Sequence, residues 1–166
     1  MDALFCPKCG CSLRVKEIYQ QLRAFCSDCG YIHYEQLKVG AGAIIEKDGK
    51  LLLLQRTEEP FRLQWNLPAG YVDISESPIQ AVLREVQEES GLKVEVKGID
   101  DIYFFNDDPR GNGILIVYKC QAIAGRLSES SEGTNPTYFT RDQIPDQLAG
   151  GGHNQAIRSW QKTSSK

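Results

Sequence analysis

The sequence predicts an α/β or α+β fold with a mixed sheet, preceded by a small cysteine-rich module. Residues 1–37 hold five of the six cysteines and few large aliphatic residues, so they cannot build a hydrophobic core unaided. Strand-like and helix-like segments then alternate from residue 38 onward, which is typical of one layered domain. A chain of 166 residues has room for one ordinary domain plus such a module. We therefore expect two domains, 1–37 and 38–166.

The predicted sheet comes from several segments with strand character. Residues 39–56 (VGAGAIIEKDGKLLLLQR) form two strands joined at Asp48-Gly49, where both residues tolerate positive φ. Residues 92–105 and 113–125 are strands on either side of the loop NDDPRGN, and residues 136–140 are a short strand. We predict that LQWNLPAGY (63–71) and SESSEGTN (128–135) are loops.

One helix is predicted with both of its ends. Ser77 is the N-cap, Pro78 takes the first helical position, and Gln80 completes a capping box. Gly91 supplies the C-terminal stop. Apolar residues recur at i, i+3, i+4 and i+7, namely Ile79, Val82, Leu83 and Val86. A second helix is expected from about His153.

Composition and charge exclude several classes of protein. The chain has 41% hydrophobic and 25% charged residues, which are values of a globular protein. A net charge of −3 argues against binding nucleic acid by bulk electrostatics. No apolar run approaches the roughly 20 residues that span a bilayer, and the N-terminus lacks the apolar region of a signal peptide. We expect a cytoplasmic protein without a membrane partner.

Two CxxC pairs, each followed by glycine, predict a metal site. They are CPKCG and CSDCG, with 16 residues between the second cysteine of the first pair and the first cysteine of the second, and the predicted ligands are Cys6, Cys9, Cys26 and Cys29. Tetrahedral Zn²⁺ needs four thiolates converging from two turns, and sites with four cysteines are closed and structural. Cys11 is a spare cysteine in this interpretation, and Cys120 is a small core residue.

The helix also concentrates charge. Glu85, Glu88 and Glu89 lie within about 100° of one another, and their mean direction points about 120° away from the apolar stripe. They are therefore expected to flank the buried face without entering it. Hard carboxylate oxygens beside an irregular loop suit Mg²⁺ or Mn²⁺, with room for water and substrate phosphates. Arg84 is expected to pair with Glu76 or Glu85 and to fix the loop against the helix.

These residues carry a resemblance to the Nudix hydrolases. The stretch GYVDISESPIQAVLREVQEESGL (70–92) fits the signature of that family at every fixed position: Gly70, Glu76, Arg84, Glu85, Val86, Glu88, Glu89, Gly91 and Leu92. Chance would produce such a match in on the order of one in a million chains of this length. A merely solvated polar face is thereby excluded.

The resemblance implies a fold and a reaction. The fold is an α/β/α sandwich with a mixed sheet, and the reaction is hydrolysis of a diphosphate linkage in a nucleoside diphosphate joined to another group. By position, the catalytic residues are Glu76, Arg84, Glu85, Glu88 and Glu89. Glu85, Glu89 and the carbonyl of Ala69 look like ligands of the catalytic metal, and Glu88 like a ligand or base. Glu129 and Glu132 are candidate bases outside the signature.

A zinc ribbon before a Nudix domain is similar to NADH pyrophosphatases and to ADP-ribose/FAD pyrophosphatases. The former carry a second signature, SQPWPFPxS, downstream of the stretch that corresponds to residues 70–92 (the Nudix box). That second signature is missing here. Many of the latter carry a proline about fifteen residues past the box, and Pro109 is close to that position but not in register. Arg56 and Arg110 are candidate phosphate-binding residues. Several aromatic residues are candidates for stacking on adenine, although at strand spacing core packing is the alternative: Trp65, Tyr71, Tyr103, Phe104 and Phe105.

The predicted substrate is therefore a small nucleotide: ADP-ribose, FAD or a related ADP-containing dinucleotide. The alternatives are NAD(H) or nucleotide-capped RNA, and damaged (d)NTPs. A nucleotide-sensing regulator whose ribbon binds nucleic acid is an alternative of another class, but such regulators tend to lose box carboxylates. Related enzymes often form homodimers, and the ribbon is a candidate interface.

Overall fold

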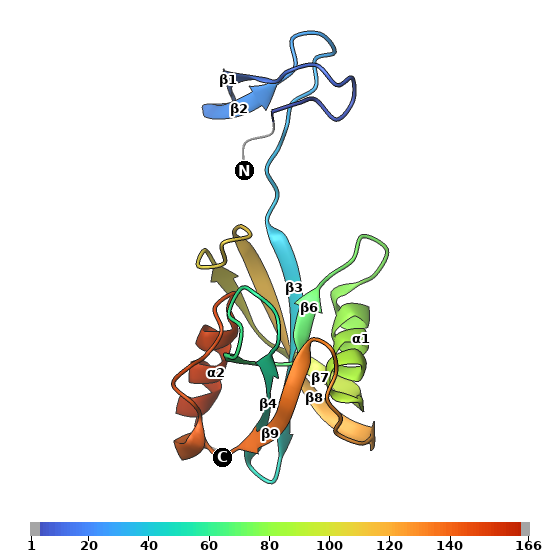
Figure 1. Ribbon diagram of the computed structural model, residues 1–166, viewed down its shortest axis with the longest axis vertical. Helices are drawn as coiled ribbons and strands as arrows, with labels where there is room; N and C mark the ends of the chain where they lie inside the picture. The colour runs from blue at the N-terminus through green and yellow to red at the C-terminus, as the bar shows by residue number, and fades with distance from the viewer. Residues whose placement is uncertain (1–3, 164–166) are drawn as a thin grey trace. The chain divides into compact units, whose positions relative to one another are not determined.

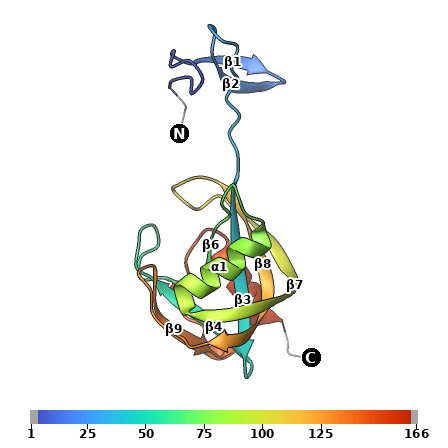
Figure 2. The ribbon, with the colours of Figure 1, turned by 90° about the vertical axis from the view of Figure 1, so that its right-hand side faces the viewer.

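The computed structural model describes residues 4–163 and divides the chain into two compact units, Met1–Gln36 and Leu37–Lys166. Figures 1 and 2 show the elements of each unit in two views. Each unit has its own sheet. Within residues 4–163, no helix is both long and apolar enough to cross a membrane.

The first unit is built from two turns that repeat the same hydrogen bonds around a short hairpin. In the first turn, the Cys6 N–H donates to Cys11 O and the Gly10 N–H to Cys6 O. In the second, the Cys26 N–H donates to Tyr31 O and the Gly30 N–H to Cys26 O. Both glycines have positive φ. Antiparallel strands β1 (Arg14–Ile18) and β2 (Gln21–Phe25) connect the turns.

The second unit contains a seven-stranded mixed sheet with the main order β5-β4-β3-β8-β7. Its strands are β3 (Lys38–Lys47), β4 (Lys50–Arg56), β5 (Trp65–Asn66), β6 (Ala69–Tyr71), β7 (Leu92–Phe105), β8 (Gly113–Gly125) and β9 (Gly133–Phe139). β3 and β8 run parallel, whereas the other pairs are antiparallel. Strands β6 and β9 pair with β3 and β4 respectively. The predicted mixed sheet is confirmed.

Two helices cover opposite faces of this sheet, α1 (Pro78–Ser90) and α2 (His153–Lys162) (Figures 1 and 2). Alternation along β4 divides the core between them. Leu51 and Leu53 pack in the cluster that contains Ile157 and Trp160 of α2, whereas Leu52 packs in the cluster that contains Val82 and Val86 of α1. The layers form the expected α/β/α sandwich. A short 3₁₀ turn, Arg141–Gln143, precedes α2.

Several predicted boundaries are confirmed and two loops are corrected. The predicted loop 128–135 ends earlier, because β9 already begins at Gly133. Asp48 and Gly49 have positive φ and join β3 to β4. Ser77 and Gln80 form the capping box, and Gly91 ends α1 in the left-handed conformation. The stretch 63–71 is not all loop, because it contains β5 and β6. These strands are two and three residues long and rest on pairing with longer neighbours, which local composition does not reveal.

Candidate active site

Helix α1 buries two of its three clustered glutamates. Glu85 and Glu89 are 8% and 4% exposed, whereas Ile79 is 47% exposed. The prediction that the carboxylates flank the buried face is therefore wrong for these two, and it holds only for Glu88. Positions 85 and 89 are one turn apart, so they lie on one line along α1 that faces the backbone of β6.

The backbone of β6 approaches these carboxylates closely because residue 70 is glycine. A Cβ built on Gly70 would lie 2.0 Å from Glu85 Oε1, so no larger residue fits without displacing that carboxylate. Next to it, the Ala69 N–H donates to Glu89 Oε2 at 2.9 Å. The Pro/Gly stretch before the helix thus brings main-chain atoms directly against the two buried acids.

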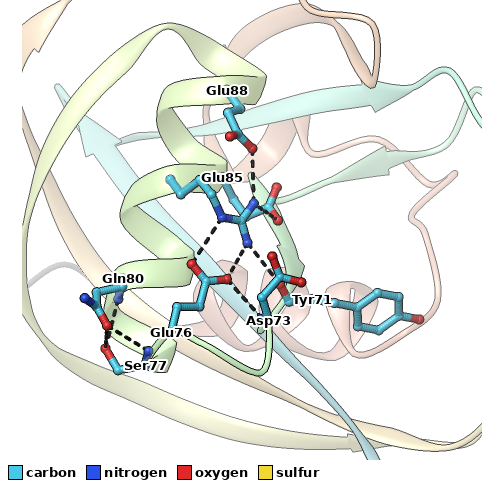
Figure 3. A network of polar contacts seen from close by, with 8 residues as sticks. Tyr71, Asp73, Glu76, Ser77, Gln80, Glu85 and Glu88 are labelled. Atoms are coloured by element: carbon cyan, nitrogen blue, oxygen red, sulfur yellow. Dashed lines mark hydrogen bonds and ion pairs between the residues drawn. The ribbon is translucent and has the colours of Figure 1, made fainter.

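Arg84 joins the acidic residues into one network (Figure 3). Its guanidinium donates to Glu76 and Glu85 at 2.6 Å each, and to Glu88 at 3.1 Å. It also donates to the carbonyl of Tyr71 at 3.1 Å. The predicted pairing of Arg84 with Glu76 or Glu85 is observed with both, so one side chain fixes the entry loop against the helix.

Burial and ion pairing shift the pKa values of the acidic residues in different directions. Burial raises the pKa of Glu89 to about 8, and Glu89 forms no ion pair within residues 4–163. Burial likewise raises the pKa of Glu85, against the opposing effect of Arg84. The hydrogen bonds from Arg84 and from the Asp73 backbone lower the pKa of Glu76. Glu89 is therefore a carboxylate that needs a cation to be stable as an anion near neutral pH.

The buried carboxylates open into a cavity of about 270 Å³. Of the residues predicted from sequence, the cavity is lined by Arg56, Ala69, Tyr71, Arg84, Glu85, Glu89, Phe105, Arg110 and Glu132. Glu76 and Glu88 contact Arg84 from outside this lining. Glu129 instead accepts a hydrogen bond from the Asn135 N–H at 3.0 Å. The structure therefore brings one of the two candidate bases, Glu132, to the cavity.

The other predicted aromatic residues do not line the cavity. Trp65 packs edge-on against Phe139 with ring centroids 4.8 Å apart, and Tyr103 is a core residue. Phe104 is exposed on β7. Cys120 is buried, as predicted, at 7% exposure.

Sequence reasoning missed four residues of the cavity wall that have polar or aromatic side chains, namely Phe61, Asp73, Asp108 and His153. Asp108 is the best anchored, because its carboxylate accepts from the Arg110 N–H at 2.8 Å and from the Arg110 side chain at 2.7 Å. The pair was visible in the sequence as Asp-Pro-Arg, an acid and a base two residues apart in a turn. The other three carry no local signal, because they come from separate segments: Phe61 and Asp73 from two loops, and His153 from the start of α2.

The four cysteines predicted to bind metal converge in the first unit. Their sulfur atoms lie within 4.8 Å of one another, with Cys6 to Cys29 at 3.6 Å and Cys9 to Cys26 at 3.5 Å. The sulfurs of a tetrahedral zinc site lie about 3.8 Å apart, given Zn–S bonds of about 2.3 Å. The cluster therefore fits zinc.

Known proteins resemble this chain both in sequence and in structure. The model of the NUDIX domain matches residues 36–159. A protein of Methanocaldococcus jannaschii named ADP-ribose pyrophosphatase is 37% identical over 116 residues, which are 69% of each chain. The NAD-capped RNA hydrolase NudC of Vibrio vulnificus is 28% identical over 144 residues, which are 85% of this chain and 52% of that protein. The alignment thus spans about half of that relative.

A solved structure has the same arrangement of elements. The crystal structure of a NUDIX hydrolase from Nitrosomonas europaea superposes with a TM-score of 0.81 at 25% identity. The superposition covers 98% of this chain and 91% of the other.

Proposed function

Because this chain belongs to the Nudix hydrolase family, we propose that it cuts the diphosphate bond of ADP-ribose, FAD or a related ADP-containing dinucleotide. One observation carries the proposal. Two buried carboxylates of α1 face a glycine backbone inside a cavity that also holds Arg56 and Arg110. Acids that bind a divalent cation and arginines that bind phosphate are what a diphosphate substrate needs.

The residues fit a divalent metal on physical grounds. Glu89 is a buried acid whose hydrogen-bond partner is a single backbone N–H, so its anion is poorly stabilised by the protein alone. We assign Glu85, Glu88, Glu89 and the Ala69 carbonyl as ligands of Mg²⁺ or Mn²⁺. The bound ion would neutralise diphosphate oxygens and lower the pKa of the attacking water.

The remaining residues of the network have positioning and proton-transfer roles in this proposal. Arg84 and Glu76 hold the helix and the loop in register, so that Glu85 keeps one orientation. Glu132 is the better candidate base, because it lines the cavity and its charge acts on both Glu85 and Glu89. Glu129 is tied to the Asn135 backbone instead.

The choice of substrate follows the relative with the higher identity. The protein of M. jannaschii is named an ADP-ribose pyrophosphatase. A second candidate is NAD(H) or NAD-capped RNA, since the relative named NudC aligns over 85% of this chain. The missing SQPWPFPxS signature argues for the first candidate.

We further propose that residues 1–37 are a structural zinc ribbon and residues 38–166 the catalytic domain. A four-thiolate site requires reduced cysteines, which suits a cytoplasmic location. The ribbon carries exposed apolar side chains, which make it a candidate surface for homodimer formation: Leu4, Phe5, Val15, Tyr19 and Leu22. Sedimentation of the wild type beside a Leu22→Ser variant tests the dimer, and a monomeric wild type excludes it.

The substrate experiment uses purified protein with Mg²⁺ or Mn²⁺ and a panel of ADP-ribose, FAD, NADH, NAD-capped RNA and dNTPs. We expect AMP as a product from ADP-ribose or FAD. Preferred turnover of NADH or capped RNA would select the second candidate, and pyrophosphate from dNTPs alone would overturn both. Binding of ADP-ribose without turnover of any compound would favour a nucleotide-sensing regulator.

A further inference from the structure

A second wall of the cavity takes no part in the proposed hydrolysis. It is formed by Gly150 and Gly151, by the first residue of α2, His153, and by the aromatic side chains of Phe61 and Tyr71. The preceding Gly152 packs against β8, since a Cβ there would lie 3.0 Å from Leu115 Cβ. This contact fixes the start of α2 on the sheet and holds His153 at the cavity.

His153 is buried and has a ring nitrogen without a partner. It is 9% exposed, and within residues 4–163 its Nδ1 atom has no hydrogen-bond partner. A buried polar atom in this state is destabilising unless something else satisfies it. His153 also lines the cavity, so a ligand bound there lies beside the imidazole ring.

Charges of both signs surround His153. Arg56 and Arg110 act to lower the pKa of the ring, and Asp108 acts to raise it. The Asp107 carboxylate accepts from the Gly151 N–H at 2.9 Å, so an acid already occupies the start of α2. Arg110 in turn is paired with Asp108. The edge of His153 is therefore left for a neutral polar group of the substrate.

The imidazole itself is neutral under ordinary conditions. Burial, reinforced by the nearby charges of Arg56 and Arg110, lowers the pKa of His153 to about 3. A neutral imidazole offers one donor and one acceptor. One of its nitrogens can therefore pair with a donor or with an acceptor on the edge of a nucleobase.

The shape of this wall favours a flat ring. Phe61 lies against the glycines, since a Cβ on Gly150 would meet Phe61 Cζ at 2.5 Å. The Tyr71 ring is held by the Arg110 guanidinium, 5.3 Å from its centroid. Aromatic side chains at a pocket wall stack on every nucleobase, so stacking does not distinguish one base from another. The polar group beside them selects the base by its hydrogen bonds.

We propose that His153 is a specificity residue that hydrogen-bonds the nucleobase of the substrate, next to the aromatic wall of Phe61 and Tyr71. The inference rests on the proposed function only for the identity of the substrate. The binding of a nucleoside monophosphate can be measured whether or not the protein hydrolyses anything.

The experiment compares AMP with ribose 5-phosphate, which lacks the base, by calorimetry on the zinc-loaded full chain with Mg²⁺. We expect His153→Phe to weaken AMP binding about tenfold, the usual loss for one buried hydrogen bond. Ribose 5-phosphate binding should stay unchanged. His153→Asn, which restores a donor and an acceptor, should recover part of the loss. Asn154→Ala, an exposed neighbour on the same turn, is the matched control.

Kinetics separate this role from a structural one. In His153→Phe, KM for ADP-ribose should rise while kcat is kept, because base binding is the same in the ground and transition states. Equal loss of AMP and ribose 5-phosphate binding, or no loss of either, would overturn the proposal. If wild-type protein binds AMP in the expected pattern but cuts no dinucleotide, the proposed function fails and the assignment of His153 stands.

Discussion

The two predicted metal sites of this chain are built in opposite ways. In the first unit, four thiols converge from two identical turns, and the gap between their sulfurs is the size of a zinc site. In α1, the acids are held by protein groups instead: Arg84 binds Glu76, Glu85 and Glu88, and the Ala69 N–H binds Glu89. A site that the protein saturates with four equal ligands stabilises structure. A site held in position from one side, and open to a cavity on the other, leaves room for substrate.

We expect the largest loss of activity from a change at Glu89. Glu89→Gln keeps the shape and can still accept the Ala69 N–H, but it removes the charge that would bind the metal. We expect kcat to fall by about 10³-fold or more, as for other losses of a metal-based or electrostatic group. The measurement is steady-state hydrolysis of the best substrate at saturating Mg²⁺.

Glu95→Gln on β7 is the matched control, since Glu95 is exposed and pairs with Lys97. The control should keep wild-type turnover, and the thermal midpoint of Glu89→Gln should not fall below that of the wild type. Near-normal activity of Glu89→Gln would remove it from the set of metal ligands.

The second prediction concerns the cysteine cluster. Cys26→Ser removes a fully buried thiol of the proposed zinc site. We expect bound zinc to drop from about one per chain to near zero and the amides of residues 4–36 to lose hydrogen-exchange protection, because such small units fold around their metal. Hydrolysis by residues 37–166 should remain, since their core is separate.

Cys11→Ser serves as the control for this variant, because Cys11 is outside the cluster of four. It should keep its zinc. Full zinc content in Cys26→Ser would show that the cluster is not the zinc site, and loss of hydrolysis there would show that the two sites depend on each other.

The two sites also differed in how far the sequence could predict them. Equal spacing within CPKCG and CSDCG predicted both the ligands and the turns, because the chemistry there is local in sequence. The helix and its caps could also be predicted, because their signals lie in neighbouring residues. The burial of Glu85 and Glu89 could not be predicted in this way, since it depends on β6, a three-residue strand that exists by pairing with β3. Asp108 and His153 reach the cavity only through the path of the sheet, which a single helix pattern cannot reveal.

A smaller effect is expected from a change at Arg84, which holds the acidic residues in position. Arg84→Lys keeps the positive charge but loses the planar fork that contacts three glutamates at once. We expect kcat to fall about 10- to 100-fold, the range for partners that orient metal ligands, while the KM for Mg²⁺ rises. Arg126→Lys, at an exposed position, should be silent. Equal activity of the two variants would mean that Arg84 does not orient the carboxylates.

The smallest effect is a pH dependence of stability in protein dialysed free of Mg²⁺ and Mn²⁺. The pKa of Glu89 is about 8 in the folded chain, against 4.5 when unperturbed. Between these values the folded state holds a proton that the unfolded state has lost, so the free energy of unfolding falls as pH rises from about 4.5 to about 8. Glu85 acts in the same direction, whereas Glu76, with a lowered pKa, acts only in more acidic solution.

Urea unfolding at several pH values measures this dependence. The free energy of unfolding should change less steeply with pH in Glu89→Gln, and added Mg²⁺ should flatten the slope of the wild type. The same slope in both proteins would mean that Glu89 is not held protonated by burial, and the electrostatic reason for assigning it a metal would be lost.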